Sequence, residues 1–348
     1  MRRLLLSLFA SLAAGASLLI PCGPAAGDSP GIAQLTQPRP GLTPEQLAAF
    51  EAGKALFVQK HPTLGPLYNA ETCASCHYIP TLGGSGDLAH AAHVAPNKDS
   101  GDVEPYRTYA LPGATVPERP ANVSRLIPPP LFGLGLVEQI PDETIRAACG
   151  TGHPDPAKLQ GSLPRNTVAR FGYKPFVGTV ADFVDGALLM ENSITSPLDK
   201  SKDDDAFPDP EVDVAFVETI AAFVRGLPPP PRNGTDAAGE AAFGALGCAT
   251  CHVPNMPPAM GVYSDFCVHG MGAALANGIV DHTAKGDEYR TTPLWGLRFK
   301  KVYLHDGRAT TVDAAIAAHD GEALAAATAY KQAPEAQRAA LLRFLDTL

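Results

Sequence analysis

Two short stretches of the chain carry the residue types best suited to hold a metal cofactor. They read Cys73-Ala74-Ser75-Cys76-His77 and Cys248-Ala249-Thr250-Cys251-His252, so both follow the pattern Cys-x-x-Cys-His. Positions i, i+3 and i+4 share one face of a helical turn. Two thiols at this spacing can bond to the vinyl groups of a haem, and the histidine that follows can reach the iron. The sequence therefore predicts two covalently bound c-type haems, attached through Cys73, Cys76, Cys248 and Cys251, with His77 and His252 as iron ligands.

A zinc site or a redox-active dithiol is the competing interpretation of each motif. Zinc would need two more cysteines or histidines close to each motif, and no second Cys-x-x-Cys lies near either one. A thioredoxin-like dithiol does not need the trailing histidine and lies in a βαβ pattern, which this sequence lacks. Two complete motifs in one chain therefore favour haem.

Size and composition restrict the class of protein further. The chain has 348 residues and a formal net charge of -9, without a run of Lys or Arg, which argues against a nucleic-acid partner. It contains 34 Pro and 33 Gly, while hydrophobic residues still make up 45%. This composition predicts long, non-helical connections around well-formed cores rather than disorder.

Residues 1–27 have the pattern of a secretory signal peptide. Arg2 and Arg3 give a positive start, an apolar stretch covers residues 4–20, and small residues lie near Gly27. The chain is therefore predicted to be exported to the periplasm, which agrees with the motifs because bacterial c-type haems are attached after export. An uncleaved membrane anchor and lipid attachment at Cys22 are the less favoured alternatives.

Two further cysteines, Cys149 and Cys267, lie outside the motifs and the signal peptide. In an oxidising compartment they could form a disulfide. They could equally be two buried free thiols, because the sequence does not place them within bonding distance.

A repeated set of elements must position the two motifs. The pattern Gly-x-x-x-Phe occurs at Gly53 and again at Gly239, each time just before a motif, and helices are predicted over residues 211–227 and 335–348. In cytochrome c domains, a glycine and an aromatic residue on the first helix allow the last helix to cross closely. The sequence therefore predicts an all-α fold of two cytochrome c-like domains, with long Gly/Pro-rich loop insertions. The predicted domains cover residues 28–227 and 232–348, separated by a proline spacer over residues 228–231.

A second internal repeat lies downstream of each motif. The segment 130–134 reads Pro-Leu-Phe-Gly-Leu and the segment 293–297 reads Pro-Leu-Trp-Gly-Leu, and each is followed by an acidic turn and a helix. The duplication therefore includes the far side of each predicted haem.

These features together resemble the bacterial di-haem cytochrome c peroxidase superfamily, and in particular its branch of di-haem, thiol oxidoreductase-like oxidoreductases. The resemblance extends over nearly all of the chain after the signal peptide. It rests on both motifs, on Gly83-Gly84-Ser85-Gly86, and on the segments 128–145, 170–174, 292–297, 304–309 and 319–323.

The resemblance implies that the two haems have different roles. The C-terminal haem would accept electrons from a small redox protein, a cytochrome or a cupredoxin, with His319 as the second ligand of its iron. The N-terminal haem would reduce hydrogen peroxide, with Gln139 and its neighbour Glu138 as the catalytic residues. The implied function is that of a peroxidase-type di-haem oxidoreductase.

Several assignments stay open at this point. The glutamate of the family has three candidates, Asp142, Glu143 and Glu191. Methionine sulfur is the rival ligand for the second iron, and the first iron could be capped by a histidine. The residues concerned are Met256, Met260 and Met271 for the second iron, and His61, His90, His93 and His153 for the first.

Three residues of the C-terminal part have smaller expected roles. His305 is predicted to donate a hydrogen bond at the haem edge, and Arg308 to pair with a haem propionate. Trp295 is predicted to pack against haem. Two other functions remain in competition with a peroxidase, namely a non-catalytic electron-transfer cytochrome and a di-haem enzyme that oxidises a protein or an organic substrate.

Overall fold

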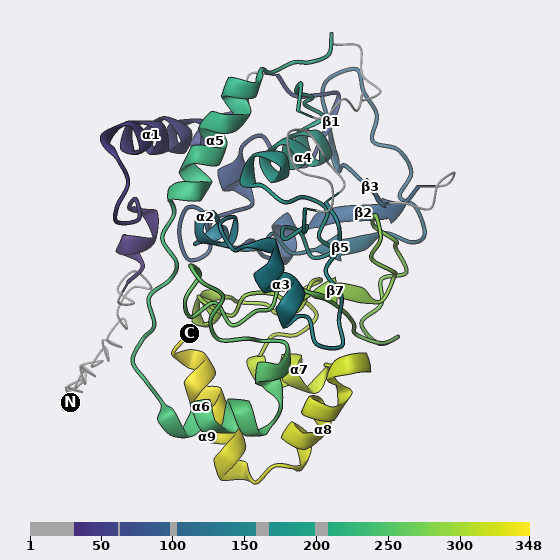
Figure 1. Cartoon of the computed structure of the whole chain (residues 1–348). Helices are drawn as coiled ribbons and strands as arrows, with labels where there is room; N and C mark the ends of the chain where they lie inside the picture. Colours follow the sequence, from purple (N-terminus) through teal and green to yellow (C-terminus); the bar gives the residue numbers. More distant parts are fainter. Residues whose placement is uncertain (1–30, 62, 98–102, 158–166, 199–207) are drawn as a thin grey trace, which may run out of the picture.

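The structure is a computed structural model that describes residues 31–61, 63–97, 103–157, 167–198 and 208–348. The predicted signal peptide and Cys22 lie outside these residues. None of the described helices is long and apolar enough to cross a membrane. Figure 1 shows two groups of helices at opposite ends of the molecule, with short strands and loops beside the first group and between the two.

The first group is built on the crossing of α1 (Pro44–Val58) and α5 (Val214–Gly226). Helix α1 begins with a capping box. The Thr43 hydroxyl accepts the backbone amide of Gln46, and the side-chain oxygen of Gln46 accepts the backbone amide of Thr43. A methyl group at Gly53 would lie 2.1 Å from the Thr219 carbonyl oxygen, so only glycine permits this crossing. The Phe57 ring packs 4.9 Å from Phe223, as the predicted Gly-x-x-x-Phe role requires.

The second group repeats this arrangement with α6 (Ala237–Ala245) and α9 (Glu335–Asp346). A methyl group at Gly239 would lie 2.2 Å from the Ala340 carbonyl oxygen and 2.4 Å from the Phe344 Cβ. The rings of Phe243 and Phe344 lie 5.4 Å apart. The predicted role of both Gly-x-x-x-Phe patterns is therefore confirmed.

We expect Gly239→Ala to destabilise the protein by about 1 to 3 kcal/mol, because the added methyl group must push α9 away from α6. The matched control is Gly244→Ala on the same helix. This residue is exposed and has open space around its Cα, so alanine should stabilise by about 0.5 to 1 kcal/mol through helix propensity alone. Urea unfolding of the two variants measures both effects. Equal midpoints for the two variants would contradict the close crossing.

The remaining helical segments are short, apart from α4. They are η1 (Ala33–Thr36), η2 (Cys73–Ser75), η3 (Leu88–His90), α2 (Leu134–Val137), α3 (Asp142–Ala148), α4 (Val180–Asn192), η4 (Cys248–Thr250), η5 (Leu297–Phe299), α7 (Val312–Ala317), η6 (Gly321–Ala323) and α8 (Leu324–Gln332).

The all-α prediction is wrong, because the structure contains three small antiparallel sheets. Helix makes up 36% of the structure and strand 12%, so the fold is mixed α/β. The sheets pair β1 (Leu67–Tyr68) with β4 (Tyr109–Ala110), β2 (Ala92–Pro96) with both β3 (Val103–Pro105) and β5 (Ser124–Leu126), and β6 (Val268–Gly270) with β7 (Glu288–Arg290). The sequence had predicted only loops between the helices. Strands of two to five residues are too short for an alternating pattern to be visible in a sequence.

Two hydrophobic cores hold the elements together. The smaller one contains Phe243 and Phe344 and stabilises the second group of helices. The larger one contains Phe50 and Phe223 but also Phe266 and Trp295, which lie beyond the four-proline spacer. The domain boundaries at residues 227 and 232 stay a prediction.

A disulfide joins Cys149 to Cys267. It connects the end of α3 to the start of β6, and so ties the N-terminal part of the chain to the C-terminal part. The sequence had left this bond open.

Candidate haem sites

Each Cys-x-x-Cys-His motif folds into one tight helical turn. The amide of His77 donates to the carbonyl of Cys73 at 3.1 Å, and that of His252 donates to Cys248 at 3.0 Å. The Thr72 hydroxyl accepts from the Ser75 amide and fixes the start of η2, whereas Gly247 begins η4 with a φ of 84°. The turn places the two thiols and the imidazole of each motif on one cavity wall.

Three histidines share the hydrogen-bond arrangement typical of metal ligands. The Nδ1–H of His77 donates to the Gly84 carbonyl at 3.1 Å, that of His252 to Tyr263 at 3.0 Å, and that of His319 to Ala315 at 2.7 Å. Such a bond fixes the tautomer and leaves Nε2 for the metal. Burial lowers the pKa of His77 and of His252 to about 4. Both rings are therefore neutral, as iron ligation requires.

The second motif opens onto a mainly apolar cavity of about 440 Å³. This volume lies within the range of about 300 to 1,000 Å³ that is usual for ligand pockets. Cys248, Cys251 and His252 line the cavity, and His319, directly after α7, lines it as well. A haem with one histidine ligand from each of two segments fits this set of donors.

Polar groups on the wall of the second cavity suit haem propionates. Nε2 of His305 is buried without a hydrogen-bond partner. Burial lowers the pKa of Lys300 to about 8, and no described carboxylate offsets this effect. Arg290 also lines the cavity, whereas Arg308 pairs with Asp306 at 2.6 Å and is absent from the lining. Lys300 and Arg290 therefore line the cavity, and the pairing of Arg308 with a haem propionate stays a prediction.

The three methionines considered as rival ligands lie in different environments. Met256 is buried in the larger core, and Met260 is 59% exposed. Met271 alone among them lines the second cavity. His319 and Met271 are thus the candidates for the second ligand of this iron.

The first motif opens onto a much smaller cavity, of about 90 Å³. Cys73, Cys76 and His77 line it, together with apolar side chains from α4 that include Phe183 and Leu188. A haem at His77 therefore needs these side chains to move outward. Among the described residues, His77 is the only histidine in the lining and no methionine contributes to it.

One carboxylate, Glu191, faces the first cavity from the end of α4. The amide of Asn69 donates to its Oε2 at 2.7 Å. Burial raises the pKa of Glu191, while the hydrogen bond from Asn69 and the charge of Arg107 act in the opposite direction. Glu191 is one of the three acids proposed from the sequence.

The other carboxylates and the amide proposed from the sequence lie outside the first cavity. Glu138 pairs with Arg225 at 2.8 Å and accepts the Val180 amide, so it joins α5 to α4. Gln139 is exposed, and its amide donates to the Gly135 carbonyl at 2.6 Å. Asp142 pairs with Arg170, and Glu143 is exposed.

The four histidines considered as caps for the first iron do not line its cavity. Nε2 of His61 lies 3.7 Å from the Cys73 sulfur, and His93 lies in β2 opposite Arg125. His153 lies between Asp155 and Glu288. His90 contacts Tyr78 and Asp87.

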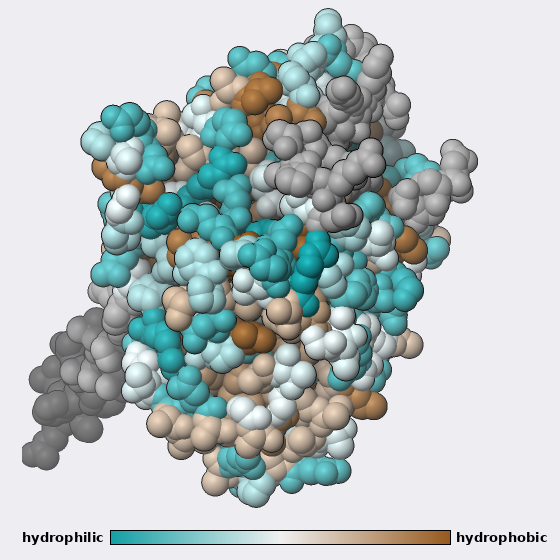
Figure 2. Space-filling view, viewed as in Figure 1, coloured by the Kyte–Doolittle hydropathy of each residue, from teal (hydrophilic) through white to brown (hydrophobic). Residues whose placement is uncertain are grey.

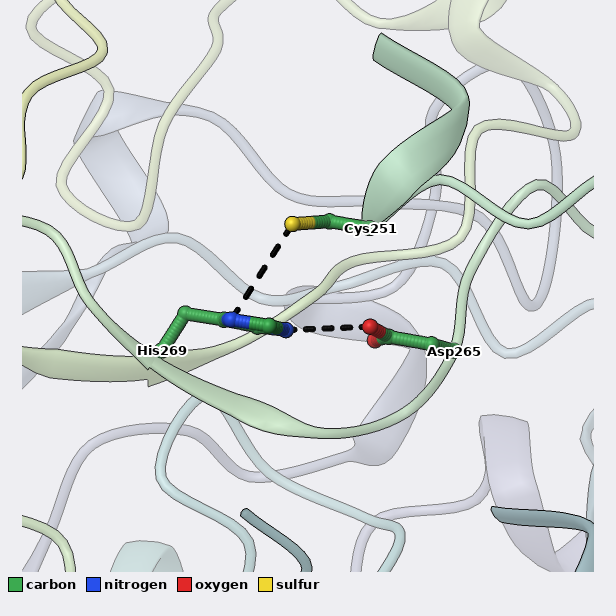
Figure 3. A group of neighbouring side chains, drawn as sticks. All are labelled: Cys251, Asp265 and His269. Carbon is green, nitrogen blue, oxygen red and sulfur yellow. Dashed lines mark hydrogen bonds and ion pairs between the residues drawn. The ribbon is translucent and has the colours of Figure 1, made fainter. Parts of the chain in front are cut away.

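The sequence did not predict a role for His269, which lies beside the second motif (Figure 3). Its ring is buried between two carboxylates: Nε2 lies 3.0 Å from Asp265 and Nδ1 lies 3.0 Å from Glu322. Nδ1 also lies 4.0 Å from the Cys251 sulfur. Burial lowers the pKa of His269, but the hydrogen bonds to Asp265, Cys251 and Glu322 outweigh this effect and raise it to about 11.

The donor atoms of Cys251, Asp265 and His269 lie within 4.8 Å of one another, as a metal site would require. Because Cys251 belongs to the motif, we assign this group to the wall of the haem cavity. Neither the spacing nor the neighbours of His269 in the sequence signal this position, which arises from the pairing of β6 with β7.

Trp295 lines neither cavity but lies next to segments that line both, and its packing against haem stays a prediction. A methyl group at Gly133 would lie 2.6 Å from its ring, and the neighbours of Gly133, Leu131 and Leu134, line the first cavity. Pro293 and Leu294, next to Trp295 in the sequence, line the second cavity. The side chain is only 5% exposed.

Comparison with protein families bears on the part of the chain that contains the second motif. Residues 182–348 match the family described as "Di-haem oxidoreductase, putative peroxidase". The resemblance to the di-haem oxidoreductases is confirmed over these residues. The matched part includes Glu191, the second motif and His319. No curated protein matches the chain.

Solved structures with similarity to the chain include two enzymes. Hydrazine synthase from Kuenenia stuttgartiensis is 14% identical, with a TM-score of 0.47 and complete coverage of both chains (100% each). The diheme peroxidase BthA from Burkholderia thailandensis is 16% identical, with a TM-score of 0.43, and the alignment covers 88% of this chain and 79% of that one. Both TM-scores lie below 0.5, so neither structure carries an argument about this chain.

Proposed function

We propose that this protein is an exported di-haem c-type oxidoreductase of the peroxidase type. Electrons would pass from the haem at His252 to the haem at His77, where hydrogen peroxide would be reduced. One observation carries the proposal, namely the difference between the two cavities. The second has a histidine with a free Nε2 in His319, and the first has Glu191 but neither a second histidine nor a methionine among the described residues.

The haem iron, when bound, supplies the redox chemistry that cleaves peroxide with two electrons and two protons. Glu191 accepts the proton of the bound peroxide and returns it to the departing oxygen. Asn69 keeps the carboxylate of Glu191 in place through its hydrogen bond. The phenylalanine and leucine side chains around His77 exclude bulk water from this site.

The expected electron donor is a small cytochrome or cupredoxin. The end of the molecule formed by the second group of helices supports this role, because weakly apolar side chains gather there in Figure 2 and α8 is rich in alanine. Ala325 and Ala326 of this helix also line the second cavity. A donor at this surface would lie close to the edge of the second haem. Export is supported by the disulfide, since such bonds persist in oxidising compartments.

Electron paramagnetic resonance of the haem-loaded protein tests the proposal. We expect one high-spin and one low-spin ferric signal in the oxidised protein, or a high-spin signal that appears when the protein is half-reduced. In either case the high-spin signal must change when hydrogen peroxide is added. Two low-spin signals that peroxide leaves unaltered in both redox states would identify an electron carrier and overturn the proposal.

His319→Gly should remove the second ligand of the C-terminal iron, so we expect the low-spin signal of that haem to become high-spin. Met271→Leu is the matched control, because it removes the other candidate ligand while it preserves the apolar wall. It should leave the low-spin signal intact. If Met271→Leu loses the low-spin signal and His319→Gly keeps it, Met271 and not His319 is the second ligand of this iron.

A further inference from the structure

A hydrogen-bonded group of three side chains lies next to the first motif. Tyr78 directly follows His77, and its hydroxyl donates to Asp87 Oδ2 at 2.7 Å. Nδ1 of His90 lies 3.1 Å from Asp87 Oδ1 and 3.2 Å from the Tyr78 oxygen. The rings of Tyr78 and His90 meet edge to face, with 5.4 Å between centroids. The phenol therefore donates to a carboxylate that can take up its proton, and the His90 ring contacts both groups.

Local backbone structure holds Asp87 in this position. Asp87 is the N-cap of η3, and its Oδ1 accepts the amides of Ala89 at 2.9 Å and of His90 at 3.2 Å. The carboxylate is thus fixed before it receives the phenolic hydrogen bond. This geometry favours transfer of the phenolic proton at the moment when Tyr78 loses an electron, because charge does not build up on the ring.

The group connects the first motif to the surface. The side chains of His90 and Asp87 are 47% and 35% exposed, and the neighbouring Leu88 is 42% exposed. At its other end, Tyr78 is bonded through the backbone to His77, and the charge of Asp87 acts on the thiol of Cys76. Leu88 offers an apolar contact for an aromatic ring next to the hydrogen-bonded phenol.

The position of Tyr78 relative to the first cavity decides where a substrate could meet it. Cys73, Cys76 and His77 line this cavity, and Tyr78 is absent from the lining. A reductant that reacts at Tyr78 therefore meets the protein outside the cavity.

We propose that Tyr78, with Asp87 and His90, is a redox-active surface site at which phenols and aromatic amines are oxidised one electron at a time. The inference rests on the proposed peroxidase function. Tyr78 gives one electron to the haem at His77 after peroxide has oxidised it, and the phenolic proton passes to Asp87. The tyrosyl radical then takes a hydrogen atom from the substrate, and Asp87 releases its proton to solvent. Two such cycles convert one hydrogen peroxide and two phenols into two waters and two phenoxyl radicals.

The test uses the haem-loaded protein with tyrosine deuterated on the ring. One equivalent of hydrogen peroxide is added, and samples are frozen rapidly for electron paramagnetic resonance. The wild type should give a radical signal that narrows on deuteration, and Tyr78→Phe should lack this signal. Steady-state oxidation of guaiacol by peroxide should fall by about tenfold or more in the same variant, which corresponds to about 1.4 kcal/mol or more in the barrier.

Two further variants separate the redox role from packing. Asp87→Asn keeps the η3 cap and the tyrosine but removes the proton acceptor, so the radical yield should fall. Tyr106→Phe is the matched control. Its hydroxyl donates only to the Pro117 carbonyl, at 3.3 Å, and a carbonyl cannot take up the proton. This control should retain both the radical signal and the guaiacol rate.

The outcomes also separate this inference from the proposed function. A wild type that reacts with peroxide but shares its radical spectrum and its guaiacol rate with Tyr78→Phe overturns the tyrosine site alone. A wild type whose spectra do not respond to peroxide overturns both.

Discussion

Glu191→Gln should slow the reaction with hydrogen peroxide by about 10²- to 10⁴-fold, the usual contribution of a positioned acid–base group. Glutamine has nearly the same shape and can keep a hydrogen bond to Asn69, but it cannot accept the proton of peroxide. Stopped-flow absorption of the haem-loaded protein measures the rate. Haem content and the low-spin signal of the second haem should stay as in the wild type, because Glu191 lines only the first cavity.

The pH dependence gives an independent check on Glu191. The carboxylate form is the one that accepts a proton, so the rate should rise as the pH increases through the pKa of Glu191. Burial raises this pKa above its usual value, while the hydrogen bond from Asn69 lowers it. Asn69→Ala removes the lowering contribution, and the rising limb should move to higher pH. In Glu191→Gln this limb should be absent.

Glu143→Gln and Gln139→Leu complete the comparison. Both residues were candidates from the sequence, and both side chains are exposed outside the first cavity. Their variants should react with peroxide at the wild-type rate. A large loss in Gln139→Leu, with little loss in Glu191→Gln, would restore the glutamine as the catalytic residue and exclude the carboxylate.

The features that could be predicted from the sequence are those whose cause lies within a few residues. Cys-x-x-Cys-His needs only one turn of backbone to bring its donors together, and the structure has that turn twice. The glycines at 53 and 239 are equally local signals, because a helix crossing without room for a Cβ requires glycine at that position. Both were therefore identified without knowledge of the fold.

The features that were missed depend on contacts between distant segments. Glu191 could not be chosen over Asp142 or Glu143 from spacing, because the fold of α4 against the first motif decides which acid faces the cavity. His269 lies in β6, a strand too short to be recognised, and meets Cys251 through the fold of the segment after the second motif. The wrong all-α prediction has the same cause.

Cys149→Ala combined with Cys267→Ala should lower the free energy of unfolding by roughly 4 to 5 kcal/mol. The bond closes a segment with a sequence separation of 118 residues, and in the chain-entropy account a loop of about 100 residues gives about 4.7 kcal/mol. Both side chains are almost fully buried, at 5% and 0% exposure, so alanine also leaves a small cavity. Guanidinium unfolding of the haem-loaded protein measures the difference.

A reductant supplies the control for this prediction. Unfolding in the presence of dithiothreitol should destabilise the wild type, because the unfolded chain loses its constraint, but should not shift the double variant. Thr151 and His269 each lie two residues after one of the two cysteines, and both contact the Glu322 carboxylate, at 2.6 Å and 3.0 Å. Loss of the disulfide should therefore loosen the wall of the second cavity and broaden the low-spin signal of its haem. Equal unfolding midpoints for wild type and double variant, with and without reductant, would show that the bond does not constrain the two parts of the chain.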